Sequence, residues 1–407
     1  MIACACITSS AVASNGLLAM ASTPAISGFV APAMIESRSR CVFGEGACAT
    51  IRSLFSDMFG RYGRPIIEQR QVVEENGAGV TGLGRIAIAG GIAILLSVVS
   101  ICARADDTVR FVALGDLPYT NSQAKDLEAE IKPKIQIGGF PFVIHYGDFK
   151  SGGDECNDAE LQAAYNQIMS LLPGRVFFTP GDNDWTDCDR KKLDQPISEL
   201  VRLAKLRDAF YSKPLAVANK MQVQRQTGYP ENAAWQYRGV QFATVHVVGT
   251  NNGRVEVKQD DFWTAMTAVW ARDTANAAWL KHSFQQAKDV SIGALVLAMQ
   301  ADPTKVRWKE PCTVDNPDRC DGFLAIKKIL VRRSAELDKP VLLIHGDTRD
   351  YCVDRAFGGS KAPNLWRLNG AGDYTFDATV VEVRADKEEQ PFRFRRLLND
   401  SLLNSEC

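Results

Sequence analysis

The sequence predicts a layered α/β fold, and two patterns carry this expectation. From Thr108 onward, short and nearly continuous apolar runs alternate with longer stretches of helical character. Such runs are typical of strands that are covered on both faces. Two more strand-like segments follow near the end of the chain, so the order of elements implies a sandwich of sheets and helices.

Each element can be placed on the chain from its own pattern. The segments expected to form strands are 109–114, 142–146, 176–179, 242–248, 294–299, 341–345, 378–383 and 392–396. The segments expected to form helices lie around 121–132, 157–171, 196–211, 259–288 and 322–337. Residues 303–321 hold three prolines and two cysteines, which predicts a loop pinned by a disulfide. We expect one domain over residues 106–400.

The charge and composition of the chain indicate which kinds of binding partner to expect. Lysine and arginine (47) nearly balance aspartate and glutamate (48) in this chain of 407 residues. A nucleic-acid partner would require a concentrated basic face, so we expect none. Histidine, the commonest transition-metal ligand, occurs only four times.

An uncharged apolar segment, 86–103, precedes the predicted domain. With Arg85 before it and Ala103-Arg104-Ala105 at its end, it has the pattern of a secretory signal peptide over residues 86–105. The alternative is a retained membrane anchor, because 18 residues can just span a bilayer. We therefore expect a periplasmic or secreted protein, or one tethered in the inner membrane and facing the periplasm.

Residues 1–85 are rich in alanine, serine and glycine and show no sustained periodicity. This composition predicts a disordered extension. A signal peptide should stand at the N-terminus, so translation could instead begin near Val80 from an alternative start codon.

Six cysteines follow the apolar segment, and an exported domain would hold them as disulfides. We expect Cys156 to pair with Cys188 and Cys312 with Cys320. For Cys352 and Cys407 both a disulfide and free thiols remain open.

Four aspartates stand directly after predicted strands, each behind a glycine: Asp116, Asp148, Asp182 and Asp347. Ligands of open α/β sheets bind outside the carboxyl ends of strands, and glycine permits a sharp turn there. Gly-Asp is also a common turn pair, so one such turn would mean little. Four carboxylates at one edge would repel one another unless a cation lay between them.

The ordered set GDLPY, YGDF, PGDND, AMQAD and HGDT resembles the calcineurin-like metallophosphoesterases, in particular a divergent bacterial branch with a PGDN-[DE]-W motif. The resemblance covers nearly all of residues 108–395. It implies a four-layer αββα sandwich of two mixed sheets flanked by helices, the metallo-dependent phosphatase-like fold. It also implies a metal-bound hydroxide that attacks a phosphate ester in line, with no phosphoenzyme.

By this resemblance Asp116 matches the first aspartate ligand and Asp148 the aspartate that bridges two metals. Asp182 stands at the position of an asparagine ligand, and Gln300 and Asp347 stand at positions of histidine ligands. Every histidine that the family uses is replaced. An all-oxygen site suits Mg²⁺, Mn²⁺ or Ca²⁺ better than zinc or iron.

Three further residues receive catalytic roles from the same comparison. Asn183 replaces the catalytic histidine and cannot act as a general acid, so His345 or water would protonate the leaving group. Arg349 replaces the second histidine of the closing motif and could grip a phosphate in two-point fashion. We expect one cation plus Arg349 rather than two cations.

The expected function is hydrolysis of a small phosphorylated substrate. A second hypothesis is a non-catalytic envelope protein of the same fold that binds a phosphorylated ligand or a metal, which the missing histidines favour. A hydrolase acting on another ester is a third, but the sequence holds no Gly-x-Ser-x-Gly motif for a serine route.

Overall fold

The structure is a computed structural model that describes residues 108–407 except 191, 218, 373 and 387–388. The expected signal peptide or anchor and the extension before it lie outside the described residues. Within the described part of the chain, no helix is long and apolar enough to cross a membrane.

One sheet has five strands in the order β12-β11-β1-β2-β3. These strands are β1 (Val109–Leu114), β2 (Val143–His145), β3 (Val176–Phe178), β11 (Thr379–Val383) and β12 (Phe392–Arg396). β1, β2 and β3 run parallel to one another. β11 pairs antiparallel with β1, and β12 pairs antiparallel with β11 at the edge of the sheet. The carboxyl ends of β1, β2 and β3 therefore lie at the same edge of this sheet.

The other sheet has seven strands in the order β4-β5-β6-β7-β8-β10-β9. They are β4 (Gln224–Gln226), β5 (Tyr229–Tyr237), β6 (Val240–Thr244), β7 (Ala294–Ala298), β8 (Val341–His345), β9 (Cys352–Asp354) and β10 (Leu365–Asn369). The central four, β6, β7, β8 and β10, are parallel, and both edges are antiparallel.

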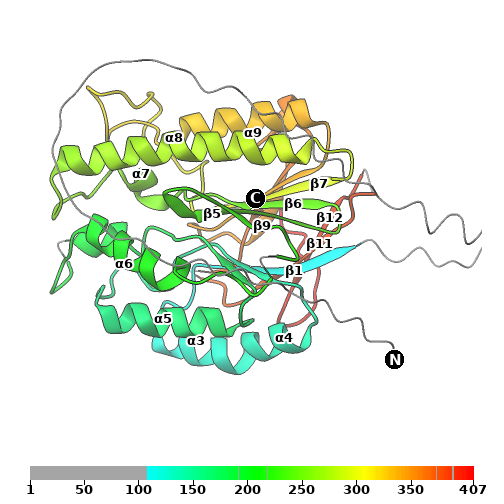
Figure 1. The fold of residues 1–407 in the computed structure, drawn as a ribbon, viewed down its shortest axis with the longest axis horizontal. Coiled ribbons are helices and arrows are strands. Elements are labelled where there is room, and N and C mark those ends of the chain that lie inside the picture. Colours follow the sequence, from blue (N-terminus) through cyan, green and yellow to red (C-terminus); the bar gives the residue numbers. More distant parts are fainter. Residues whose placement is uncertain (1–107, 191, 218, 373, 387–388) are drawn as a thin grey trace, which may run out of the picture. The chain divides into compact units, whose positions relative to one another are not determined.

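The principal helices are α3 (Asn121–Asp126), which continues through the π-helical turn η1 (Leu127–Ile131) into α4 (Lys132–Ile137), then α5 (Asp158–Ser170), α6 (Glu199–Tyr211), α8 (Phe262–Ala287) and α9 (Leu324–Leu337). Their caps follow from the sequence: the side chains of Thr120, Asn157, Ser198 and Asp261 each accept a backbone N–H at a helix start. Figure 1 shows α3 to α6 along one side of the sheets and α8 and α9 along the other.

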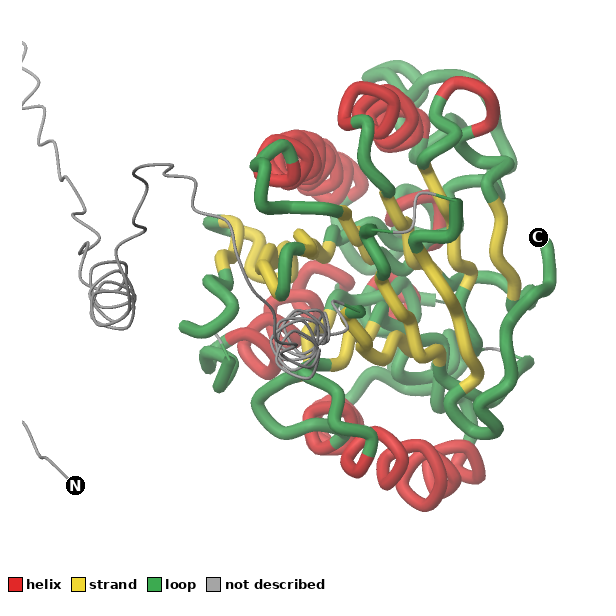
Figure 2. The backbone as a smooth tube through the Cα atoms, turned by 90° about the vertical axis from the view of Figure 1, so that its right-hand side faces the viewer, coloured by secondary structure: helices red, strands yellow, loops and turns green. Residues whose placement is uncertain are grey.

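Three apolar clusters hold the layers together. Phe111 of β1 and Phe242 of β6 belong to the cluster between the sheets. Leu127 and Leu206 pack with the outer face of the first sheet, and Leu280 of α8 packs with that of the second. The expected four-layer arrangement of two mixed sheets flanked by helices is confirmed, and Figure 2 shows two layers of strands between helices.

The strands that the sequence did not predict are β4, β5, β9 and β10. Their residues form no continuous apolar run. The three residues of β4 are polar and exposed or half-buried, and β5 and β10 bury charged and amide side chains of their own. Glu231 and Asn232 in β5 lie in a polar network with His246, and Arg367 of β10 pairs with Asp354 of β9. Such networks satisfy buried polar groups but leave no apolar pattern in the sequence.

Three disulfides join Cys156 to Cys188, Cys312 to Cys320 and Cys352 to Cys407. The two expected pairs are confirmed, and of the two alternatives for the third pair the disulfide is the one observed. Residues 303–321 form the expected loop, with no helix or strand. Three disulfides indicate an oxidising compartment.

Candidate functional site

The four predicted aspartates converge from both sheets. Asp116, Asp148 and Asp182 follow β1, β2 and β3 at one edge of the first sheet, and Asp347 follows β8 of the second. The backbone N–H of Asp347 donates to Asp116 Oδ2 at 2.9 Å, which joins the two sheets at this point. Asp116, Asp148 and Asp182 are no more than 6% exposed. We call these four residues the aspartate cluster.

Glycine is required where these turns approach one another. A Cβ atom on Gly181 would overlap the Asp148 carboxylate, and one on Gly346 would overlap the Asp116 carboxylate. Each glycine therefore lets the turn of one strand lie directly against the carboxylate that follows another strand.

Asp148 lies at the centre of a hydrogen-bond network. Gln300 Nε2 donates to Asp148 Oδ2 at 3.0 Å and to Asp182 Oδ1 at 2.9 Å. The other end of that amide, Gln300 Oε1, accepts the N–H of Gly249 at 2.6 Å, which fixes the orientation of the amide group. In this arrangement Gln300 presents its nitrogen, not its oxygen, to the aspartate cluster.

Tyr119 adds a second donor that the sequence reading did not assign. Its hydroxyl donates to Asp148 Oδ2 at 3.1 Å, lies 3.5 Å from Asp116 Oδ1, and accepts Asn183 Nδ2 at 3.2 Å. The signal for Tyr119 in the sequence was its place three residues after Asp116, in the first Gly-Asp turn. Asn183 also donates its backbone N–H to Asp148 Oδ1 at 3.1 Å.

The carboxylates perturb one another electrostatically. Burial, and then the charges of Asp182 and Asp116, raise the pKa of Asp148 well above its ordinary value. The same causes in the same order raise the pKa of Asp347. Burial and the nearby Asp148 raise the pKa of Tyr119, so its hydroxyl stays protonated and donates.

Asp184 holds two of the turns in place. Its Oδ2 accepts the N–H of Asp148 at 3.0 Å and that of Gly181 at 2.8 Å, and its Oδ1 accepts the N–H of Phe149 at 2.9 Å. Burial raises the pKa of Asp184 to about 6 even though these three donors lower it. This residue therefore positions the cluster and is fully occupied by backbone donors.

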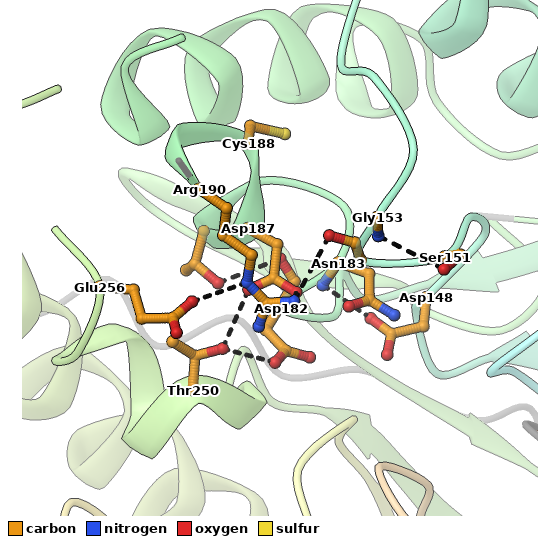
Figure 3. Close-up of polar contacts among 12 residues, drawn as sticks. Asp148, Ser151, Gly153, Asp182, Asn183, Asp187, Cys188, Arg190, Thr250 and Glu256 are labelled. Carbon is orange, nitrogen blue, oxygen red and sulfur yellow. Dashed lines mark hydrogen bonds and ion pairs between the residues drawn. The ribbon is translucent and has the colours of Figure 1, made fainter. Parts of the chain in front are cut away.

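A second group of polar side chains adjoins the cluster (Figure 3). Thr250 donates its hydroxyl to Asp182 Oδ2 at 2.6 Å, and the same Oγ1 lies 3.1 Å from Asp187 Oδ1. Arg190 pairs with Asp187 at 2.6 Å and with Glu256 at 2.7 Å. Burial, followed by the charge of Asp182, raises the pKa of Asp187 to about 8, and Arg190 opposes this increase.

Two residues that were given catalytic roles lie in other surroundings. His345 is buried, and its Nδ1 lies 2.9 Å from the carbonyl oxygen of Gly346. Burial lowers the pKa of His345, so the ring is neutral near pH 7. Arg349 is exposed, and its guanidinium lies over the ring of Tyr374 at 4.2 Å from the centroid.

The chemistry of the donors fits a hard divalent cation, because carboxylate oxygens converge in a buried place. Their spacing is set by hydrogen bonds. Among the residues that the structure describes, no three His, Cys, Asp or Glu side chains stand at distances that would hold a metal ion. A cation would have to compete with Tyr119 and Gln300 for oxygens of Asp148.

No protein-family model matches the chain, and no curated protein sequence matches it. Similar solved structures include PhoD, at 11% identity over 72% of this chain and 67% of that chain, with a TM-score of 0.43. GAP50, the anchor in the inner membrane complex of Plasmodium, is 13% identical over 74% of this chain and 90% of that chain, with a TM-score of 0.40. Purple acid phosphatase PPD1 of yellow lupin is 8% identical over 74% of this chain and 53% of that chain, with a TM-score of 0.40. At these identities and TM-scores the matches assign no family or activity to the chain.

Proposed function

We propose that the chain is an exported, metal-dependent phosphoesterase whose aspartate cluster binds one divalent cation. The observation that carries the proposal is the meeting of four buried or half-buried carboxylates from strand ends of both sheets. Burial, and then the charges of the neighbouring aspartates, raise the pKa values of Asp148 and Asp347, and a divalent cation would relieve this repulsion. The all-oxygen donor set favours Mg²⁺, Mn²⁺ or Ca²⁺ over zinc.

Asp116, Asp148, Asp182 and Asp347 would hold the cation, and Gln300 would orient two of them through its amide nitrogen. When bound, the cation would act as a Lewis acid that lowers the pKa of a water molecule and offsets the charge of the phosphate. The chain's own contribution is to align these carboxylates and to keep the turns rigid through Asp184.

In the proposed reaction the oxygen of water bonds to phosphorus and releases a proton to solvent. The ester P–O bond breaks, and the leaving oxygen keeps its electron pair and takes up a proton. Asn183 can donate a hydrogen bond to a phosphate oxygen but has no proton to deliver near pH 7. The Nδ1 of His345 is engaged by Gly346, so solvent is the proton source that the arrangement favours. Substrates with good leaving groups should therefore react fastest.

The test is hydrolysis of 4-nitrophenyl phosphate and bis(4-nitrophenyl) phosphate with added Mg²⁺, Mn²⁺, Ca²⁺ or Zn²⁺. We expect activity with at least one of the first three cations and a loss of roughly 100-fold in Asp148→Asn, as expected when metal binding is impaired. Asp158→Asn is the matched control, because Asp158 is exposed and pairs only at the surface with Lys205. Unchanged activity in Asp148→Asn would remove the proposed centre.

One observation favours a second candidate, a non-catalytic protein that binds a phosphorylated ligand. Gln300 Nε2 lies between Asp148 and Asp182, and the Tyr119 hydroxyl lies between Asp148 and Asp116. These donors stabilise the carboxylates without a cation. Absence of turnover with every cation, together with binding of inorganic phosphate in calorimetry, would favour this second function.

A further inference from the structure

A pocket of about 320 Å³ has Asn251 in its lining, and the residue before Asn251 in the chain, Thr250, contacts Asp182 of the aspartate cluster. Its lining includes Asn251, Glu256, Lys305, Arg307, Trp308 and Phe323, and we call it the rim pocket. Its volume is at the lower end of the range for sites that bind small molecules.

A single turn connects the rim pocket to the cluster. In the short segment α7 (Gly249–Gly253), Thr250 donates to Asp182, and the next residue, Asn251, lines the pocket. Thr250, Asn251 and Asn252 all have φ between 52° and 57°, a left-handed conformation that is costly for residues other than glycine. Side-chain hydrogen bonds hold this turn, so the pocket and the cluster keep a fixed relative position.

Asn251 also contacts the loop 303–321, which supplies the lining residues Lys305, Arg307 and Trp308. Its Nδ2 donates to the carbonyl oxygens of Asp318 and Cys320, and its Oδ1 accepts the N–H of Gly322 at 3.0 Å. The loop 303–321, closed by the Cys312–Cys320 disulfide, is thereby attached to the turn that contacts Asp182.

Arg190 makes a second connection. It pairs at once with Asp187, next to the cluster, and with Glu256 in the lining of the rim pocket. Figure 3 shows Glu256, Arg190 and Thr250 directed toward one another beside Asp182. Lys305 and Arg307 outnumber Glu256 among the lining residues, so the lining carries a net positive charge.

The lining combines aromatic surface with positive charge. The Arg307 guanidinium lies 5.0 Å from the centroid of the Trp308 ring. Trp308 is half-buried and supplies the aromatic surface that a ligand can reach, because Phe323 is only 3% exposed. Phe323 is also the N-cap of α9, so the positive end of that helix dipole adjoins the pocket. Aromatic rings and guanidinium groups stack on planar ligands, and the cations favour an anionic substituent.

We propose that the rim pocket binds the leaving group of the substrate, and that this leaving group carries an aromatic ring and an additional negative charge. The inference rests on the proposed function, since it assigns the substrate class of the same site. The pocket binds and orients this group, and it adds no bond-forming step of its own. An aromatic leaving group would also suit a site without a general acid at Asn183, because phenolates leave readily.

The test is isothermal titration calorimetry of the full-length protein with Mn²⁺ and three non-hydrolysable probes: methylphosphonate, phenylphosphonate and 4-phosphonobenzoate. We expect phenylphosphonate to bind about tenfold more tightly than methylphosphonate. The additional carboxylate should make 4-phosphonobenzoate bind about threefold more tightly than phenylphosphonate, because partly exposed ion pairs contribute about that much to affinity.

Three variants separate the rim pocket from the rest of the site. Trp308→Ala should remove the preference for phenylphosphonate and leave methylphosphonate affinity unchanged, whereas Trp308→Phe should retain most of the preference. Trp263→Ala is the matched control, because Trp263 is 53% exposed at the start of α8.

The outcomes distinguish the inference from the function on which it rests. Equal affinity for methylphosphonate and phenylphosphonate, or an equal loss of both in Trp308→Ala, would overturn the rim pocket as leaving-group site while leaving the phosphoesterase proposal standing. Binding of none of the probes would contradict the proposed function, and the inference with it.

Discussion

The clearest structural consequence concerns Asp184, whose carboxylate accepts three buried N–H groups from Asp148, Phe149 and Gly181. Asp184→Ala would leave all three donors without an acceptor. Asp184→Asn has one oxygen in place of two, so it can retain the two donors that now share Oδ2 and lose the third. The two variants therefore differ by two unsatisfied N–H groups.

The magnitude follows from the cost of a buried unsatisfied donor, about 1–3 kcal/mol each. Asp184 has a pKa raised to about 6 by burial, so its ionised form is penalised at pH 7. Both variants remove that charge, so its penalty does not contribute to the difference in stability between them. We expect Asp184→Ala to be less stable than Asp184→Asn by about 2–4 kcal/mol, since water entering the space left by the side chain will recover part of the cost.

The assay is urea unfolding at pH 7 with the disulfides intact, followed by tryptophan fluorescence. Asp208→Ala serves as the control, because Asp208 is exposed on α6 and such substitutions change stability by about 0.5 kcal/mol or less. A difference below about 1 kcal/mol between the alanine and asparagine variants would refute the role assigned to Asp184 as the acceptor that holds both turns.

Three other expectations follow from the structure. Burial raises the pKa of Glu199 to about 8, so stability is lost as pH rises from the ordinary pKa of a glutamate through 8. The free energy of unfolding should therefore fall by about 4 kcal/mol from pH 5 to pH 9, and Glu199→Gln should flatten that decline in pH-dependent urea titrations. A Cβ on Gly181 would overlap the Asp148 carboxylate, so Gly181→Ala should lower the melting temperature and abolish phosphatase activity, whereas retained activity would contradict the close approach. The Cys156–Cys188 disulfide closes a loop of 32 residues, so the double serine variant should lose about 4 kcal/mol in chemical denaturation; a loss below about 1 kcal/mol would contradict this estimate.

The sequence predicted those parts of the fold in which local pattern and burial agree. The apolar runs at 109–114 and 341–345 became β1 and β8 with the expected bounds, because both faces of these strands are covered. Strand β5 was not predicted. The buried carboxylate of its Glu231 is stabilised by contacts with Arg207 and His246. Both partners are distant from Glu231 in the chain, so the sequence pattern of the strand does not show them.

The same contrast holds at the candidate site. The aspartate of each Gly-Asp turn could be predicted because the signal is local to one strand end. Thr250 lies 68 residues from Asp182, and Arg190 lies 66 residues from Glu256, so no spacing in the sequence connects these pairs. Gln300 was predicted as a metal ligand, and its amide nitrogen contacts Asp148 and Asp182. The direction of that amide depends on Gly249, which only the folded chain brings near.

Direct measurement of Mn²⁺ binding to metal-free protein tests the central claim most closely, because it does not depend on turnover or on the choice of substrate. Electron paramagnetic resonance can count free Mn²⁺ during a titration at pH 7.5. The account predicts one bound Mn²⁺ per chain, lost in Asp148→Asn and retained in Asp158→Asn. No binding by the wild-type chain, or two tightly held transition metals per chain, would contradict it.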